Sequence, residues 1–469
     1  MSNVKSKKLK VFCAMSGGVD SSVAAGLLKQ EGYEVIGAHM KCWSDGSPTS
    51  PRLRRADACA SEQDAEDARR AAEVLGIPFY VFDFEKEYKE KVVEYMVDGY
   101  RQGITPNPDV MCNKEIKFGL FLKKALEMGA DYVATGHYVC LVERRNFIPS
   151  TRSSATADSL VLARFADRGF AKTIGPGKAA ARVSKNKASS LYGIQSSCSA
   201  CVSCGNYGAL KCSDFCEAKN FRARRRRGRP PEATDAGAVR NAGGAALFTA
   251  KDKNKDQSYF LWTLTQEQLR HCLFPIGDYL KPDVRKMARK FGLPNAEKKD
   301  SQGICFLGQV TLKDFLGNYL PEKRGLILNT VGKVVGEHQG AHFYTIGQRG
   351  GLGLGGQVKP VYIAEKDIKE NAILVAEEND AVLYKKEIEL KNVNLINSEL
   401  KILNHELLIP IFVRVRYRQP LVKAKLVICR MPYATCKLVF DKPQKFVAAG
   451  QSAVFYNARG AMLGGGTIA

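Results

Sequence analysis

The sequence predicts an α/β protein in which a doubly wound parallel sheet is followed by a small helical domain and a C-terminal β-barrel. Three observations predict this order. Strand-like and helix-like segments alternate over residues 9–138, and helical crossovers join parallel strands. Short helical patterns fill residues 252–294. Beyond residue 325, short β-prone runs alternate with glycine or charged turns, as in small barrels.

The elements of the predicted sheet are recognised by their residue patterns. Runs of apolar and β-branched residues mark four strands, at 9–15, 33–41, 77–84 and 131–138. Apolar residues at helical spacing mark four helices, at 20–32, 57–76, 85–100 and 117–130. Ligands of such sheets bind beyond the carboxyl ends of the strands. The segment 14–22, Met40 and Gly136–His137 all fall at such ends, which predicts a nucleotide site there.

Residues 14–22, AMSGGVDSS, form the turn between the first strand and the first helix. At a helix N-terminus the backbone N–H groups are unpaired, and the helix dipole favours an anion. Gly17 and Gly18 let the backbone approach a ligand, while Ser16, Ser21 and Ser22 add hydroxyl groups. The patterns GxxxxGK[ST] and GxGxxG are both absent. The form SGGxDS resembles instead the PP-loop of ATP pyrophosphatases, which cleave ATP between its α- and β-phosphates. A plain helix cap is the alternative.

Length and composition limit the class of protein. A chain of 469 residues exceeds one typical core, which predicts several domains. No run of 18 apolar residues exists, and the basic N-terminus lacks the apolar stretch of a secretory signal, so a cytoplasmic location is expected. In that compartment the 14 cysteines are interpreted as thiols, metal ligands or catalytic groups. The expected domains are an ATP-binding domain at 1–140, a basic insert at 141–250, a central helical domain at 251–324 and a barrel at 325–469.

The net charge of +23 favours a polyanionic partner such as nucleic acid. Residues 141–250 hold 19 Lys/Arg and 7 Asp/Glu, largely because of the tract 222–230, RARRRRGRP. This segment also contains five closely spaced cysteines, namely Cys198, Cys201, Cys204, Cys212 and Cys216. Their spacing allows zinc binding without matching a standard zinc ribbon. A minor-groove hook, a disordered basic tract that adds RNA affinity, and a gene-model artefact are the other interpretations.

Two further cysteines lie in unusual loops. Cys112 belongs to TPNPDVMCNKEIKF, where two prolines bracket Asn107 and restrict the backbone. We expect Lys114 and the following helix N-terminus to favour a thiolate at Cys112. Cys305 belongs to KKDSQGICFLG, downstream of two lysines. Both cysteines are candidates for reactive thiols, and burial as small apolar residues is the alternative.

Nine motifs occur in an order that resembles the tRNA-specific 2-thiouridylases, the MnmA/TrmU family. They are AMSGGVDSS, TPNPDVMCNKEIKF, ATGHY, KDQSYFL, DSQGICF, GEHQG, TIGQRGGLG, RVRYRQ and GQSAVFYN. The resemblance covers about residues 1–140 and 250–469. It implies ATP-dependent replacement of the C2 oxygen of the wobble uridine in the tRNA anticodon loop by sulfur. The resemblance also implies ATP with Mg²⁺ as cofactors and a sulfur-donor protein as partner, either a cysteine desulfurase or a sulfur-relay carrier. It implies no association with a membrane.

The resemblance also implies roles for individual residues. Cys112 is expected as the nucleophile and Cys305 as the carrier of a persulfide, with Asp109 as acid or base beside the uridine. The residues expected at ATP are Ala14, Met15, Ser16, Gly17, Gly18, Val19, Asp20, Ser21, Met40 and Gly136. Those expected at the tRNA are Asn107, Pro108, Asp109, His137, Lys255, Asp256, Gln257, Arg416, Tyr417 and Gln451. No resident metal site is expected. Whether the persulfide attacks directly or releases hydrosulfide stays open.

The chain departs from the family pattern in two places. Two other functions are the alternatives. The second strand ends in GAHMKCW, where an aromatic residue at 39 and Asn at 42 are expected. About a hundred residues separate ATGHY from KDQSYFL, where family members carry a short hairpin. Another PP-loop adenylating enzyme, acting on tRNA or a small molecule, would share the anion-binding turn but lack the two cysteine loops. A catalytically idle nucleic-acid-binding protein would show damage to the turn or to the cysteines.

Overall fold

The computed structural model describes residues 8–43, 53–143, 244–299, 311–355, 359–396, 407–428 and 436–469. The tract 222–230, the five insert cysteines and Cys305 lie outside these residues. Two units are distinguished, and one of them, residues 148–241, falls wholly in the part that is not described. No helix within the described residues is long and apolar enough to cross a membrane.

The N-terminal sheet has five parallel strands in the order β3-β2-β1-β4-β7. The four predicted strands are confirmed, and their bounds are β1 Lys10–Ala14, β2 Glu34–Lys41, β3 Phe79–Asp83 and β4 Tyr132–Thr135. The fifth strand, β7 at Cys272–Leu273, comes from the region expected to be helical. Two residues carry too little pattern to be recognised as a strand, and only pairing with β4 defines them.

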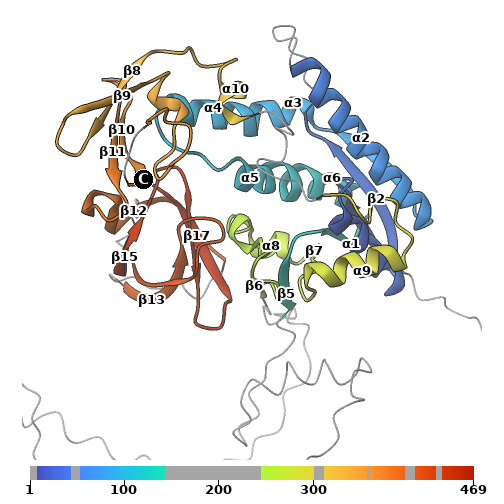
Figure 1. Ribbon diagram of the computed structural model, residues 1–469. Helices are drawn as coiled ribbons and strands as arrows, with labels where there is room; N and C mark the ends of the chain where they lie inside the picture. Colours follow the sequence, from blue (N-terminus) through green and yellow to red (C-terminus); the bar gives the residue numbers. More distant parts are fainter. Residues whose placement is uncertain are drawn as a thin grey trace, which may run out of the picture. The chain divides into compact units, whose positions relative to one another are not determined.

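Helices cover both faces of this sheet because alternate residues of β1 point to opposite sides. Val11 and Cys13 belong to a core with helices α1 (Val19–Gln30), α2 (Leu53–Val74) and α9 (Lys281–Lys290). Helices α1 and α2 pack against strand β2 of the sheet (Figure 1). Phe12 and Ala14 belong to the core on the other face. Its helical segments are α3 Glu85–Tyr88, η1 Lys89–Val93, α4 Glu94–Arg101, α5 Pro108–Met111, η2 Cys112–Phe121 and α6 Leu122–Glu127. The doubly wound arrangement is therefore confirmed.

The ends of the expected insert are strands. β5 (Val139–Glu143) pairs antiparallel with β6 (Ala245–Thr249), in register from Val139 with Thr249 to Glu143 with Ala245. The interruption in the family pattern therefore begins after Glu143 and ends before Ala245, which is shorter at both ends than the expected 141–250. The central region adds the short helices η3 Ser258–Phe260, α8 Gln266–Leu269 and α10 Leu312–Leu316.

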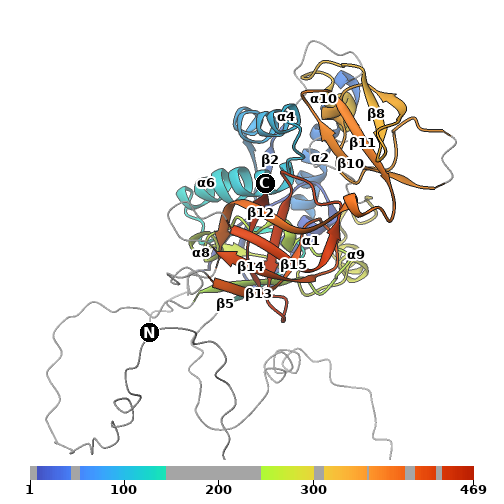
Figure 2. The same cartoon turned by 90° about the vertical axis from the view of Figure 1, so that its left-hand side faces the viewer.

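The C-terminal region forms two separate β structures, where the sequence predicts one barrel. A four-stranded sheet in the order β10-β11-β8-β9 comes first, made of β8 Gly325–Asn329, β9 Val334–His338, β10 Val361–Asp367 and β11 Ala372–Glu377. The short helices η4 (Ala341–Phe343) and η5 (Ala381–Leu383) accompany it. A closed barrel in the order β12-β15-β14-β13-β16-β17 follows (Figure 2). Its strands are β12 Tyr384–Leu395, β13 Leu407–Arg414, β14 Val422–Ile428, β15 Cys436–Lys445, β16 Ser452–Tyr456 and β17 Met462–Ile468.

Candidate active site

The turn between β1 and α1 is closed by its own hydroxyl groups. Gly17 has a φ of +74°, and a Cβ there would lie 2.3 Å from the carbonyl oxygen of Asp64, so only glycine fits. The Ser21 hydroxyl accepts from the amide of Ser16 at 3.1 Å and donates to the carbonyl of Gly18 at 3.1 Å. Ser22 donates to the same carbonyl at 3.1 Å. Two of the three predicted serines therefore also shape the turn.

The groups that this turn presents fit the oxygens of a polyphosphate. Within the described residues, no acceptor is found for the amides of Gly17 and Gly18. Gly136, expected at the nucleotide, lies against the start of α1, because a Cβ there would be 2.6 Å from the amide nitrogen of Ser21. Met40 is half-buried at the carboxyl end of β2. The predicted strand ends therefore meet around the turn, as expected for an anion site of this fold.

The charge beside the turn comes from Lys281, which sequence reasoning missed. Its Nζ lies 2.8 and 2.9 Å from the two carboxylate oxygens of Asp20, and the Tyr138 hydroxyl donates to Oδ1 of Asp20 at 2.8 Å. The turn itself lacks the lysine of a Walker motif, and α9 supplies one from 261 positions away. The only local sign was a basic residue beside Pro282 at a helix start.

The segment that follows α9 also contacts the turn. The amide of Asn295 donates from Nδ2 to the carbonyl of Gly17 at 2.9 Å and to the Ser22 hydroxyl at 3.0 Å. Its buried Oδ1 has no hydrogen-bond partner among the residues that the structure describes. Lys298 bridges Asp64 and Asp67 of α2 at 2.6 Å each. No group of three or more His, Cys, Asp or Glu side chains that could hold a metal ion occurs in the described segments. Asp20 is the carboxylate of the turn itself, and in this structure it is paired with Lys281.

The second part of the site is the proline-bounded loop that leads to Cys112. Asn107 caps α5, since its Oδ1 accepts from the amide of Val110 at 3.2 Å, and Pro108 follows in the first turn. The Gln451 amide holds the loop from the barrel side by donating to the carbonyls of Thr105 at 2.9 Å and Pro106 at 3.3 Å. The loop that leads to Cys112 is thus restrained by a tertiary contact with Gln451 as well as by its prolines.

Cys112 is buried, with 5% of its surface exposed. Burial raises the pKa of its thiol. Lys117 and a hydrogen bond from Tyr88 lower the pKa of Cys112, whereas Asp109 raises it. The expectation that Lys114 favours the thiolate is wrong, because Lys114 forms an ion pair with Glu115 at 2.9 Å and Lys117 is the lysine coupled to the sulfur.

Four residues expected at the tRNA are buried by the fold, namely Asn107, Pro108, His137 and Asp256. Asp256 is 2% exposed; it accepts from the amides of Ala250 at 3.1 Å and Ser258 at 3.2 Å and forms an ion pair with Arg414 at 2.5 Å. His137 is 7% exposed, and its ring centroid lies 6.1 Å from that of Phe118, so burial holds its pKa well below the usual range. The Asp256 and His137 side chains are thus engaged inside the protein in this structure, and their contact with tRNA stays a prediction.

The remaining residues expected at the tRNA, Asp109 among them, keep accessible surface. Lys255, Gln257, Arg416, Tyr417 and Gln451 are all half-buried. The Tyr417 ring centroid lies 4.5 Å from that of Phe260, and the guanidinium of Arg418 lies 5.2 Å above the Tyr417 ring. The Tyr259 hydroxyl donates to the carbonyl of Ser452 at 2.9 Å and also interacts with the Asn107 side chain. Aromatic rings therefore border the loop that carries Asn107 and Cys112.

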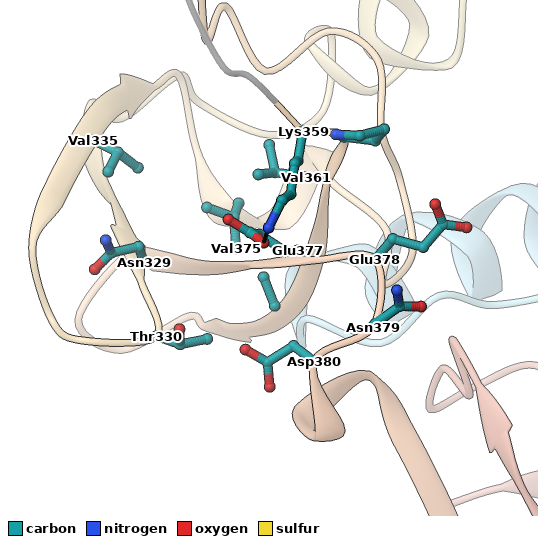
Figure 3. Close-up of a pocket in the computed structure, with 12 residues that line it drawn as sticks. Asn329, Thr330, Val335, Lys359, Val361, Val375, Glu377, Glu378, Asn379 and Asp380 are labelled. Carbon is teal, nitrogen blue, oxygen red and sulfur yellow. Dashed lines mark hydrogen bonds and ion pairs between the residues drawn. The ribbon is translucent and has the colours of Figure 1, made fainter.

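A cavity of about 690 Å³ lies elsewhere, on the four-stranded sheet (Figure 3). It is lined by polar residues from the ends of β8, β10 and β11, among them the ion pair of Lys359 with Glu377 at 3.0 Å. None of the predicted site residues lines it. The cavity is therefore separate from the candidate active site.

Three features define a nucleotide-binding protein of the PP-loop class. They are the parallel sheet, the Gly-Ser turn at its first strand and the lysine that α9 supplies. Family profiles match along the chain: a tRNA methyl transferase HUP domain at 9–189 and 233–309, a tRNA methyl transferase PRC-barrel domain at 313–377, and an aminomethyltransferase beta-barrel domain at 385–468.

Curated relatives identify the family. The tRNA-specific 2-thiouridylase MnmA 1 of Geobacillus kaustophilus is 37% identical, over 96% of this chain and 93% of that protein. The MnmA of Lactobacillus johnsonii is 35% identical, over 99% of this chain and 96% of that protein. The MnmA of Streptococcus agalactiae is 36% identical, over 98% of this chain and 95% of that protein. The chain belongs to the MnmA family of tRNA-specific 2-thiouridylases. Among solved structures, a predicted subunit of a tRNA methyltransferase from Methanocaldococcus jannaschii covers 33% of this chain and 63% of its own at 18% identity, with a TM-score of 0.18.

Proposed function

We propose that the protein is an ATP-dependent sulfurtransferase that converts the wobble uridine of tRNA to 2-thiouridine. The observation that carries this proposal is the match to 2-thiouridylases over 96% or more of the chain. The closed anion-binding turn, with Lys281 beside Asp20, supports ATP use, and the buried Cys112 in its clamped loop supports sulfur chemistry. The net charge of +23 supports a polyanionic substrate.

The chemistry begins with a poor leaving group, the C2 oxygen of uridine. ATP adenylates this oxygen and releases pyrophosphate, which makes AMP the leaving group when sulfur attacks C2. Lys281 and the amides of Gly17 and Gly18 are suited to hold the negative phosphate oxygens during this step. Mg²⁺ bound with ATP would neutralise further phosphate charge, and Asp20 is the carboxylate that would contact it.

Sulfur arrives as a persulfide on Cys305, supplied by a donor protein that bears a persulfide. In one route the Cys112 thiolate attacks Sγ of Cys305, which gives a Cys112–Cys305 disulfide and a hydrosulfide ion that attacks C2. The sulfane sulfur is reduced and the two thiols are oxidised, so a dithiol reductant must restore them. In the other route the Cys305 persulfide attacks C2 directly and displaces AMP; the Cys112 thiolate then attacks Sγ of Cys305, which breaks the S–S bond, leaves the sulfur on uridine and gives the same disulfide. Asp109 is the proposed acid or base beside the uridine.

The uridine must leave its stack to reach a buried thiol. We propose that Asn107, Pro108 and Asp109 contact the extruded base, and that the aromatic pair of Phe260 and Tyr417 borders its path. Further tRNA contacts are proposed for Lys255, Gln257, Arg416 and Gln451. We further propose a cytoplasmic location. The domain bounds 1–140, 141–250, 251–324 and 325–469 stay a prediction, and the β5–β6 pairing and the separate sheet and barrel favour an insert at 144–244 and two units after residue 325.

One experiment separates thiolation from the methyl transfer named in the family profiles. Purified protein is incubated with unmodified tRNA, ATP, Mg²⁺ and a cysteine desulfurase with cysteine, and the tRNA is digested to nucleosides for mass spectrometry. We expect the mass change of sulfur for oxygen on uridine, together with AMP and pyrophosphate. Cys112→Ser should abolish the product, whereas Cys140→Ser, which removes a half-exposed thiol bonded to Asp278 at 3.3 Å, should not. Added methyl groups, or ADP and phosphate as products, would refute the proposal.

A further inference from the structure

Cys112 begins a π-helical segment, η2, that runs to Phe121. In a π-helix the amide of residue i+5 bonds to the carbonyl of residue i, which widens the turn, so residues four and five apart follow one another along one face. In an α-helix that neighbour would instead be three or four residues away. The π register therefore places Ile116 and Lys117 one turn beyond Cys112, where an α register would place Glu115 and Ile116, so Lys117 is the neighbour that the π register adds.

The glycine at position 119 suits this register. A Cβ on Gly119 would lie 2.8 Å from the carbonyl oxygen of Lys114, five residues earlier. Glu115 is meanwhile held away by two lysines, Lys114 at 2.9 Å and Lys91 of η1 at 3.5 Å. Glu115, the carboxylate of this turn, is thus paired with other cations, and Lys117 is the cation that the π register adds to the face that begins at Cys112.

The charged and titratable groups around Cys112 come from three elements. They are Lys117 of η2, Asp109 of α5 and Tyr88 of α3. Burial and the Asp109 carboxylate both oppose ionisation of the thiol, and Lys117 favours it. His137 is also coupled to Lys117, and the charge of that lysine lowers the pKa of the buried imidazole.

We propose that Lys117 is a positioning residue for sulfur transfer: its ammonium, aligned by the π-helix, stabilises the Cys112 thiolate that attacks the persulfide. This inference rests on the proposed function for its role in turnover, but the state of the thiol can be measured without tRNA, ATP or a sulfur donor. The thiol proton leaves to solvent, and the lysine keeps its own protons throughout.

The test is the pH profile of Cys112 alkylation. The full-length protein is treated with iodoacetamide at a series of pH values, and the labelled tryptic peptide 102–114, which contains no other cysteine, is quantified by mass spectrometry. Lys117→Met should raise the midpoint of the profile by about one pH unit, the lower end of the effect of one nearby opposite charge. The rate at neutral pH should fall only about threefold, because the remaining thiolate is more basic and more nucleophilic.

Two variants control for structural damage. Lys117→Arg keeps the charge and should leave the midpoint near that of the wild type. Lys114→Met removes the neighbouring lysine that pairs with Glu115, and should not move the midpoint, measured on the extended peptide 102–117. Thiolation by Lys117→Met should recover as the pH is raised, which a misfolded variant cannot do. Should Lys117→Met fail to fold, Lys117→Gln supplies the same comparison.

An unchanged midpoint in Lys117→Met, or an equal shift in Lys114→Met, would overturn the proposal. Failure of the wild type to thiolate tRNA would refute the proposed function instead, and would leave the midpoint comparison intact.

Discussion

The ion pair between Asp256 and Arg414 should be a stability element that joins the central segment to the barrel. Its side chains are 1% and 8% exposed, and the two charged atoms are 2.5 Å apart. Removing one partner of a buried pair leaves an uncompensated charge. Arg414→Met should therefore lower the free energy of unfolding by about 3–5 kcal/mol. The guanidinium also lies 5.5 Å from the Tyr456 ring centroid, a contact that adds up to about 1 kcal/mol.

The second variant also removes the Asp256 carboxylate, the buried charge that Arg414→Met leaves without its partner. Asp256→Asn combined with Arg414→Met keeps a side-chain oxygen for the amides of Ala250 and Ser258 but leaves no buried charge. This double variant should unfold within about 2 kcal/mol of the wild type, and so should be more stable than Arg414→Met alone. Lys359→Met, which breaks the exposed pair with Glu377, should cost less than about 1 kcal/mol.

The assay is guanidinium unfolding followed by tryptophan fluorescence. The chain has two tryptophans, and Trp262 is 4% exposed, with its indole N–H donating to the Ser452 hydroxyl at 3.0 Å. In a Trp43→Phe background the emission therefore reports the junction between the central segment and the barrel. Equal midpoints for wild type and Arg414→Met would refute the reasoning, as would a double variant no more stable than Arg414→Met.

tRNA binding separates this role from direct recognition. If Asp256 is structural, the double variant should bind tRNA as the wild type does once its stability has returned. A double variant that is stable but has lost tRNA affinity would support Asp256 as an RNA contact.

Three further predictions concern catalysis and the interrupted hairpin. Lys281→Met should reduce kcat/KM for ATP cleavage to AMP and pyrophosphate by about 10- to 100-fold, the range for one hydrogen bond to a charged group; an unchanged value would mean that its contact with Asp20 at 2.8 Å is structural. Cys112→Ser and Cys305→Ser should each stop thiolation while ATP binding, measured by calorimetry, is retained, and full activity in either would remove that cysteine from the mechanism. Replacing residues 144–244 by Asn-Gly should preserve thiolation, because the paired ends of β5 and β6 meet there and a two-residue turn can join them. The affinity for tRNA should fall, and the slope of log affinity against log salt concentration should become shallower by roughly 0.7–0.9 for each phosphate contact that is lost. Unchanged affinity and slope would show that the basic tract does not contact tRNA.

The amino-acid sequence by itself determined the elements whose cause is local. The four longer strands of the sheet follow from runs of apolar residues, and the anion-binding turn follows from Gly17 and Gly18 between a strand and a helix. The cap at Asn107 and the start of α5 at Pro108 depend on side chains within one turn of each other. Such features need no knowledge of distant residues, and the motifs that resemble the family add the reaction.

Only the tertiary structure decided which distant groups meet. Lys281 reaches Asp20 across 261 positions, and the two-residue strand β7 exists because β4 offers it hydrogen bonds. Asp256 stands in a conspicuous motif, and burial against Arg414 gives it a structural role. The choice of Lys117 over Lys114 depends on the hydrogen-bond register of one helix, which residue spacing alone does not specify. In each case the deciding energy is electrostatic or hydrogen-bonding and depends on distance in space, whereas sequence patterns record only distance along the chain.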